Sequence, residues 1–338
     1  MSKRVFFFDT LRCVAAVTVI AIHALGPYRH LFGDIPFSEW ASAVTVNSIS
    51  RWAVPVFIMI TGALMLSDKR PFDLRYYMKR RLAKVLIPFV VWSLFYAYLS
   101  GWSAQGYNGE QSVQVLAEGY QHATYYHLGF FYYFIPLYFL IPFFQYMVRN
   151  EREKEINLYL GIWLISSALF LYGVDGPWSN QYWLYSGYLL LGYLLYQRLA
   201  LSKAVTLLFF LAGCLGLAST VWMVITQSLE SGEYTVGRWL SYKTLNTIAV
   251  ASMIFVLGRA CGEQVSLGSG KVIRFISRHS LGIYILHPVF LWPMIELKWY
   301  EGNHPLLMIP LWVVLSGSGA LTISWLLSRS RYTNWLVP

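Results

Sequence analysis

Three ionisable residues lie in the first apolar segment of this 338-residue chain, in the stretch FFFDTLRCVAAVTVIAIH. Arg12 and His23 are eleven residues apart, about three helical turns, so both side chains are predicted on one face, about 16 Å apart along the axis. Asp9 shares that face and can pair with Arg12. The face is thus polar from the start of the segment to its far half, and an imidazole there could act as a general base.

A purely structural interpretation of these residues also stays open. Asp9 and Arg12 could extend to the membrane interface, and His23 could be a hydrogen-bonded core residue. Ionisable groups inside a spanning segment are costly, however, and mark functional sites by default. We therefore predict that this face lines a protein-walled cavity, with His23, Arg12 and Asp9 as the catalytic group.

The second segment, NSISRWAVPVFIMITGAL, carries an arginine near its predicted outer end and a proline in its interior. Arg51 is expected to contact the substrate. Pro55 can leave backbone groups free to meet a ligand or water. An ordinary kink beside an interfacial arginine would give the same pattern.

A dense basic cluster precedes the third segment, in LRYYMKRRLAKVLIP. Its members are Lys79, Arg80, Arg81 and Lys84. Arginine and lysine recognise phosphates through charge-assisted bonds, so the cluster could bind a phosphorylated cofactor. From chemistry alone, binding of anionic membrane lipid is the stronger interpretation.

Two later segments add histidines and tyrosines. In SRHSLGIYILHPVF, Ser280, Tyr284 and His287 follow helical spacing and share a face. His287 is predicted about 10 Å into its helix, in the inner half of the membrane, and is assigned with Tyr284 to the cofactor site. His127 and Tyr133 precede or begin another segment and are assigned to the substrate site, although an interfacial aromatic belt is the stronger interpretation there.

The elements that must position these residues are membrane helices. The chain is 57% hydrophobic and 12% charged, whereas soluble domains are roughly 25% charged. A spanning helix needs roughly 20 mainly apolar residues. The sequence predicts an all-α polytopic protein, a single domain over residues 1–338, with about ten such segments: 7–28, 43–66, 82–100, 128–148, 156–174, 181–197, 204–226, 241–258, 280–297 and 305–328.

The distribution of basic residues supports this topology. With the N-terminus in the cytoplasm, twenty of the 26 Lys and Arg, including Lys3 and Arg4, fall on the cytoplasmic side and five fall outside. Such a bias follows the positive-inside rule and places both termini in the cytoplasm. The net charge of +10 then reflects loops that face anionic lipid, so no nucleic-acid partner is expected. Three scattered cysteines have no metal-ligand spacing, so no metal is expected either.

Taken together, these segments resemble the acyltransferase-3 family of membrane O-acyltransferases. The resemblance rests on FDTLR with Arg12 and His23, on VPVFIMITGAL, on RRLAKVLIP and on SLGIYILHP, in this order along the chain. Thr61 stands before Gly62, where many members of the family have serine. The length and the SRWAVPVF segment look most like the enterobacterial common antigen O-acetyltransferase branch.

This resemblance implies transfer of an acyl group, usually acetyl, from cytosolic acetyl-CoA to a hydroxyl of a cell-envelope glycan or lipid-linked saccharide. It implies a multi-pass protein of the bacterial inner membrane, with His23 as base or acyl carrier and phosphates bound at the basic cluster. The alternatives are a transporter or flippase for a glycan or lipid-linked sugar, and a signalling membrane protein. Transporters often show inverted repeats and broken helix pairs, which we do not find in the sequence.

Overall fold

The computed structural model describes residues 5–262 and 267–338, and the predicted cytoplasmic position of Lys3 and Arg4 lies outside these ranges. The described chain is helical except for a short antiparallel pair of strands, β1 (Trp102–Ser103) and β2 (Gly106–Tyr107), and one isolated bridge. The helices are α1 (Phe6–Ala24), α2 (Phe37–Ser50), α3 (Ala53–Leu66), α4 (Leu74–Tyr77), α5 (Ala83–Ser100), α6 (Gly109–Ala117), α7 (Gly129–Arg149), α8 (Glu153–Leu171), α9 (Gln181–Tyr193), α10 (Lys203–Ser231), α11 (Leu245–Cys261), α12 (Leu267–Arg278), α13 (Ser280–Glu296) and α14 (Pro305–Arg329).

The predicted all-α fold is thus confirmed in its main part, with the small hairpin as an exception. Every predicted apolar segment overlaps a helix. Within the described residues, seven helical stretches are long and apolar enough to span a membrane, and α11 and α13 are shorter apolar helices. The segment 181–197 forms α9, which continues as a π-helix to Arg198. The number of spans and the sides of the termini stay predictions.

The second predicted segment is two helices rather than one. α2 and α3 meet at Arg51 and Trp52, within one apolar stretch that runs from Phe37 to Leu66. Pro55 explains the position of the break, because its ring clashes with the carbonyl four residues earlier, at Arg51, and it has no N–H to donate. Arg51 therefore lies midway along this stretch and just before α3, and its place near the outer end of the span stays a prediction.

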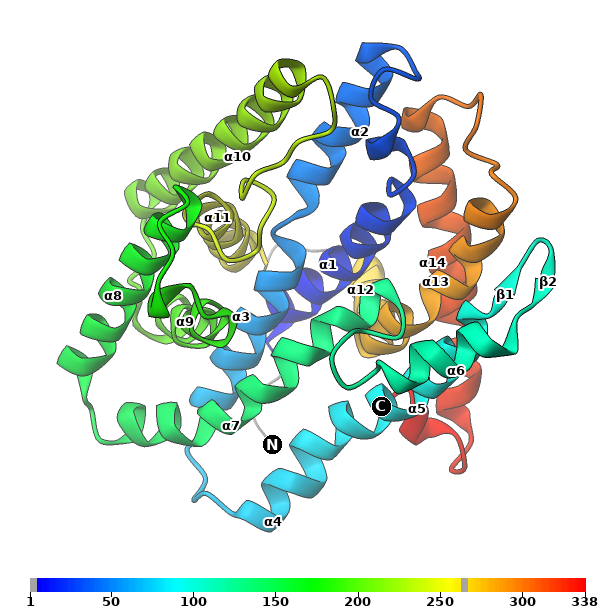
Figure 1. Cartoon of the computed structure of the whole chain (residues 1–338). Coiled ribbons are helices and arrows are strands. Elements are labelled where there is room, and N and C mark those ends of the chain that lie inside the picture. Colours follow the sequence, from blue (N-terminus) through cyan, green and yellow to red (C-terminus); the bar gives the residue numbers. More distant parts are fainter. Residues whose placement is uncertain (1–4, 263–266) are drawn as a thin grey trace.

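α3 lies in the middle of the helix assembly and packs against α1, α7, α9 and α11 (Figure 1). Two glycines bring it very close to α9. A Cβ at Gly62 would lie 2.0 Å from the Leu189 carbonyl oxygen, and one at Gly192 would lie 2.1 Å from that of Met59. Small residues allow such backbone contact in membrane helices. The contact fixes α3, and with it Arg51, against the rest of the molecule.

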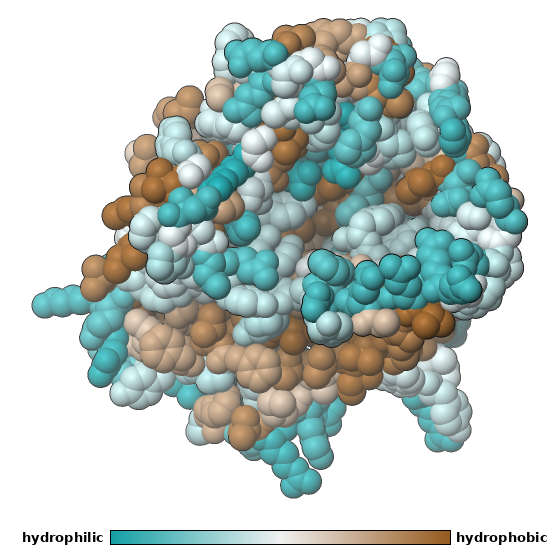
Figure 2. All heavy atoms as spheres, viewed as in Figure 1, coloured by the Kyte–Doolittle hydropathy of each residue, from teal (hydrophilic) through white to brown (hydrophobic). Residues whose placement is uncertain are grey.

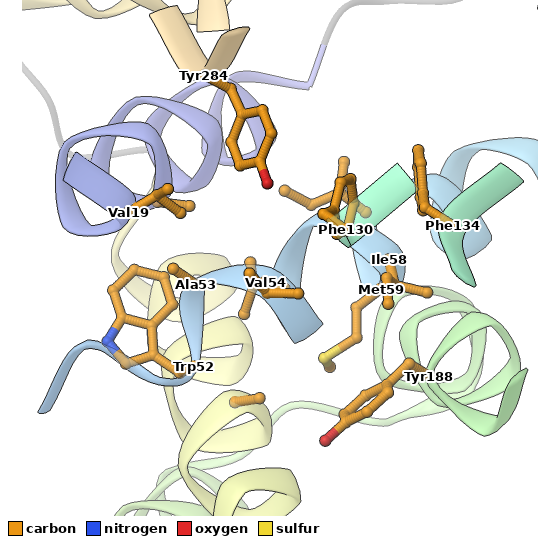
Figure 3. Close-up of a cluster of buried hydrophobic side chains, with 14 of the residues drawn as sticks. Val19, Trp52, Ala53, Val54, Ile58, Met59, Phe130, Phe134, Tyr188 and Tyr284 are labelled. Carbon is orange, nitrogen blue, oxygen red and sulfur yellow. The ribbon is translucent and has the colours of Figure 1, made fainter. Parts of the chain in front are cut away.

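Buried apolar side chains from several helices surround α3. Figure 3 shows Tyr284 of α13 pointing into the space between α1 and α3, beside Val19, Val54 and Phe130. All four side chains are buried, and they belong to one continuous core. The core thus reaches the helices that carry the predicted site.

The surface has a different distribution of side chains. In Figure 2, hydrophilic side chains border a hollow in the face shown, and hydrophobic side chains form a band below it.

Two helices lie where the sequence predicted loops. α6 follows the β hairpin, and α12 lies within the stretch assigned to a basic loop before the segment 280–297. α12 packs against α1, and its Ser277 hydroxyl donates to Asp9 Oδ1 at 2.7 Å. α12 thus gives the N-terminal end of α1 a protein neighbour.

Candidate active site

Three histidines from separate parts of the chain meet at the C-terminal end of α1. His23 is stacked on His287 of α13, with ring centroids 5.2 Å apart and an interplanar angle of 25°. His127, just before α7, lies 5.6 Å from His287 in an edge-on arrangement. We call His23, His127 and His287 the histidine cluster. The prediction that placed His23 and His287 in different halves of the membrane is wrong, because their rings are in contact.

The members of the histidine cluster differ in exposure. His127 and His287 are 1% and 0% exposed, whereas His23 is half-buried. His287 Nδ1 lies 3.1 Å from the Ile283 carbonyl oxygen, and its Nε2 has no partner. Both ring nitrogens of His127 are likewise unpaired. His127 is therefore a core residue, and its interpretation as part of an aromatic interfacial belt is wrong. His23 is the most exposed member of the histidine cluster, and His127 lines the same cavity as His23.

His23 opens onto a cavity of about 510 Å³, which we call the outer cavity. Its walls are mainly aromatic. Tyr126 packs over His23 with ring centroids 4.7 Å apart, and Tyr133 is stacked on Tyr185 at 3.8 Å. Sugar rings present apolar faces and hydroxyl edges, which such amphipathic tyrosines can contact. The outer cavity therefore has the chemical lining of a saccharide site.

A second cavity of about 100 Å³ lies along the same face of α1 and contains Arg12. Tyr284 and Phe130 line both cavities, so these two side chains are part of the partition between them. Ser280 and Tyr284 line the Arg12 cavity together, which confirms their predicted shared face. The face from Arg12 to His23 is thus bordered by cavities, as predicted. The pairing of Asp9 with Arg12 stays a prediction; the structure shows Asp9 buried and bonded to Ser277.

Aromatic rings continue from this face toward the basic end of the molecule, where α1 begins. Each ring lies within 6.5 Å of the next, from Tyr77 beside the basic cluster to His287. This row of rings runs Tyr77, Tyr138, Phe134, Phe130, Tyr284 and His287. It forms a continuous wall between the basic end and the histidine cluster.

The basic cluster does not form one site, contrary to the prediction. Lys79, Arg80 and Lys84 line a cavity of about 570 Å³ with Arg278 and His279, and none of its described lining residues is acidic. We call it the cationic cavity.

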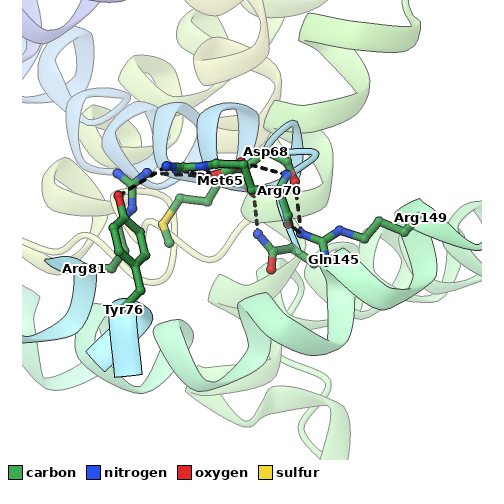
Figure 4. A network of polar contacts seen from close by, with 7 residues as sticks. All are labelled: Met65, Asp68, Arg70, Tyr76, Arg81, Gln145 and Arg149. Carbon is green, nitrogen blue, oxygen red and sulfur yellow. Dashed lines mark hydrogen bonds and ion pairs between the residues drawn. The ribbon is translucent and has the colours of Figure 1, made fainter. Parts of the chain in front are cut away.

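Arg81 faces a different cavity, of about 210 Å³, which contains the Asp68 network (Figure 4). Arg70 Nη2 lies 2.5 Å from Asp68 Oδ2, and Arg81 lies 3.8 Å from the same oxygen. Arg149 donates to the Asp68 carbonyl at 3.1 Å and to the Arg70 carbonyl. The Arg70 hydrogen bonds lower the pKa of Asp68, so its charge persists and partly offsets those of Arg70 and Arg81. The structure therefore distinguishes Arg80 from Arg81.

Several residues at the site were missed by the sequence analysis. Tyr126, Tyr185 and Tyr242 line the outer cavity, and Tyr242 accepts a bond from Arg51 at 3.1 Å. A signal existed for Tyr126, because it directly precedes His127. Tyr185 comes from a segment without a charged residue, so nothing in the sequence marked it. Tyr242 directly precedes Lys243, the one charged residue of its segment. No group of three His, Cys, Asp or Glu among the described residues is arranged to hold a metal ion.

The helices and the buried polar face define a multi-pass membrane protein with an internal site. A family model described as an acyltransferase domain matches residues 5–329, nearly the whole chain. The chain therefore belongs to the acyltransferase-3 family and is an acyltransferase. No curated protein and no solved structure compared with the chain matches it.

Proposed function

We propose that this acyltransferase moves an acyl group, most simply acetyl, from cytosolic acyl-CoA to a hydroxyl of an envelope glycan or lipid-linked saccharide. The observation that supports the proposal is the position of His23, which is half-buried in the wall of the aromatic outer cavity, on the helix whose Arg12 lines a second cavity. As the sequence resemblance implies, the setting is the bacterial cytoplasmic membrane. Within the family, the enterobacterial common antigen O-acetyltransferases are the branch we favour.

The cationic cavity fits the donor. Coenzyme A carries several phosphate charges, and four cationic side chains with no acidic neighbour among the described lining can offset them. Arg80 is the central member of this proposal, since Arg81 is tied to Asp68. The donor's acyl arm would then follow the face of α1 past Arg12, along the row of rings. Tyr284 and Phe130 would have to move aside to let the acyl group reach His23.

His23 would act as the general base. The acceptor hydroxyl would give its proton to His23 while its oxygen bonds to the thioester carbonyl carbon. The carbon–sulfur bond then breaks, and the sulfur takes the proton back from His23, which balances the reaction. A variant of this route, in which His23 itself carries the acyl group briefly, uses the same geometry. His287 would position His23 by stacking on it.

Sidedness provides the sharpest test, because acyl-CoA is made in the cytoplasm and glycans are completed outside. The protein would be placed in membrane vesicles of known orientation, with labelled acetyl-CoA supplied on one side and acceptor glycan on the other. Transfer should require donor at the face that holds the cationic cavity and acceptor at the face that holds the outer cavity. Transfer with both substrates confined to the donor face would contradict the through-membrane route.

A complementary test uses whole cells. Mass spectrometry of envelope glycans from cells with and without this gene should show the loss of one acetyl mass. Cells that carry His23→Ala should match cells without the gene. Net movement of unmodified saccharide without any acetyl transfer would instead support the transporter alternative.

A further inference from the structure

A pair of arginines lies beside the histidine cluster without an acidic partner. Arg51 stands at the break between α2 and α3, and its Nη1 donates to the Tyr242 hydroxyl at 3.1 Å. Its guanidinium also lies over the Tyr242 ring, 5.2 Å from the centroid. The buried Nε of Arg51 has no hydrogen-bond partner. Arg51 thus contacts Tyr242, a residue in the wall of the cavity that His23 faces.

Arg29, in the short helical turn Tyr28–His30 after α1, is the second cation. Its Nε donates to His30 Nε2 at 3.2 Å, and the His30 ring lies edge-on to that of Tyr234, with centroids 5.6 Å apart. Arg29 also lies within electrostatic range of Arg51, Tyr234 and Tyr242. Both arginines also lie within such range of His23. Burial, together with the charge of Arg51, lowers the pKa of the Arg29 guanidinium. None of the ion pairs between described residues includes Arg29 or Arg51.

An asparagine one turn before Arg51 completes this group. Asn47 is fully buried, and its Nδ2 donates to the Tyr234 hydroxyl at 3.4 Å. Its Oδ1 has no partner. A buried amide oxygen without a bond is costly, and it can accept from a sugar hydroxyl or another donor. Arg29, Arg51 and Asn47 together offer two charges and one acceptor toward a ligand, and we call them the arginine pair with Asn47.

Two half-buried guanidinium groups that repel each other require a compensating charge. Carboxylates and phosphates match the planar fork of arginine and are its usual partners. We propose that the arginine pair with Asn47 binds an oxyanion on the acceptor, either the carboxylate of an acidic sugar or the phosphate of a lipid-linked saccharide. This inference rests on the proposed function and adds the charge of the acceptor to it.

The position of the pair gives the oxyanion a role in selecting the hydroxyl to be acylated. An anion held at Arg51 fixes the saccharide at one point, while the tyrosines of the outer cavity contact its rings. The hydroxyl at His23 is then set by its distance from the acidic group. The anion would also neutralise two positive charges beside His23, where the proton arrives during transfer.

The proposal can be tested by binding, independently of acyl transfer. Purified protein in lipid nanodiscs would be titrated with three labelled probes: a methyl glucuronoside, its neutral methyl ester, and a neutral sugar that carries a phosphodiester. One or both anionic probes should bind at least tenfold more tightly than the ester, since one charge-assisted bond alone gives about that factor. Preference for the glucuronoside identifies a sugar carboxylate, and preference for the phosphodiester identifies a lipid-linked phosphate.

Variants assign the preference to the arginines. Arg51→Gln and Arg29→Gln should each reduce the ratio of the affinities for the anionic probe and the neutral ester toward one. Arg51→Lys should retain part of this preference. Lys298→Gln is the matched control, because it removes an exposed cation that lies 3.3 Å from Glu301 in the turn after α13. Equal binding of all three probes by the wild-type protein would overturn the inference. Acetyl transfer to a neutral acceptor with no anion preference would do the same while leaving the proposed function intact.

Discussion

The two ends of α1 handle their buried polar groups in opposite ways. At the basic end these groups have partners: Asp9 is bonded to Ser277, and Arg259 donates to the carbonyls of Leu195 and Leu199 at 2.7 and 2.8 Å. At the other end, nitrogens of His127 and His287 and the Nε of Arg51 have none. Buried polar groups without bonds cost free energy unless a ligand or water completes them. The comparison indicates that the polar groups at the basic end are satisfied within the folded protein, whereas those at the other end are arranged to bind a ligand.

The largest expected effect is on acyl transfer and comes from His23, at the C-terminal end of α1. His23→Gln should reduce acyl transfer by about 10²–10⁴-fold, the usual contribution of a general base, because glutamine cannot take up the proton. The midpoint of thermal unfolding of this variant should stay close to that of the wild type, since the His23 side chain makes no hydrogen bond to another described residue in the free protein. His304→Asn, an exposed histidine at the start of α14, is the control. Wild-type turnover in His23→Gln would mean that the half-buried histidine is not the base.

The second effect separates the two halves of the basic cluster. Arg80→Ala should weaken acyl-CoA binding about tenfold, because it removes one charge-assisted contact from the cationic cavity. Arg81→Ala should change binding less, since Asp68 already offsets its charge. Direct titration with a non-hydrolysable acyl-CoA analogue measures both. If neither variant binds less tightly, the cationic cavity serves anionic lipid; the reverse order would place the donor at the Asp68 network.

A third effect should appear in stability. Ser277→Ala removes the hydroxyl that donates to buried Asp9 and should lower the free energy of unfolding by about 1–3 kcal/mol. Ser328→Ala is a suitable comparison, because Ser328 is only half-buried and its hydroxyl donates within its own helix, to the Trp325 carbonyl. Denaturant titration in detergent micelles would compare the two variants. An equal, small change in both would show that the basic end does not depend on this bond.

The smallest effect concerns pH. The pKa of Asp68 lies below its ordinary value of 3.8 because of the Arg70 hydrogen bonds. The stabilisation from this pair is therefore full above pH 3.8 and is lost as the pH falls through the lower folded value. The hydrogen-exchange protection factors of the loop between α3 and α4, which correct for the intrinsic pH dependence of exchange, should fall over that acid range in the wild-type protein. Those of Asp68→Asn should not change with pH there; a parallel fall in both would assign the change to other groups.

Much of the fold could be predicted because a membrane span is a local property. Runs of about 20 apolar residues identify helices without any knowledge of their neighbours. The break at Arg51 was harder, since Pro55 marks a disturbance but the disturbed carbonyl lies one turn earlier. α12 was missed because its charges match those of a basic loop. Hydropathy depends on the composition of such a helix and carries no information about the helix on which it packs.

The site could be predicted only in part, for a related reason. Arg12 and His23 share one helix, so their common face follows from spacing. His127 and His287 come from α13 and the approach to α7, and nothing local shows that they converge on His23. Arg80 and Arg81 are neighbours in sequence and yet line different cavities. Contacts between distant segments depend on packing, which a single sequence does not display.

A π-helical turn from Met78 to Leu82 contains both Arg80 and Arg81, so the cavities that these residues line depend on the number of residues in this turn. A π turn is equivalent to one residue inserted into an α-helix, so the chain before it is rotated by about 100° relative to regular winding. Removing Met78 would restore the α-helical register and turn α4 by that angle about the axis of α5. Tyr76 and Tyr77 would then leave the Asp68 network, while Lys84 and Arg80 would keep their place. Deleting one residue would thus disrupt the cavity that contains the Asp68 network and preserve the cationic cavity. The two cavities can therefore change independently in evolution, although one helix contributes to both.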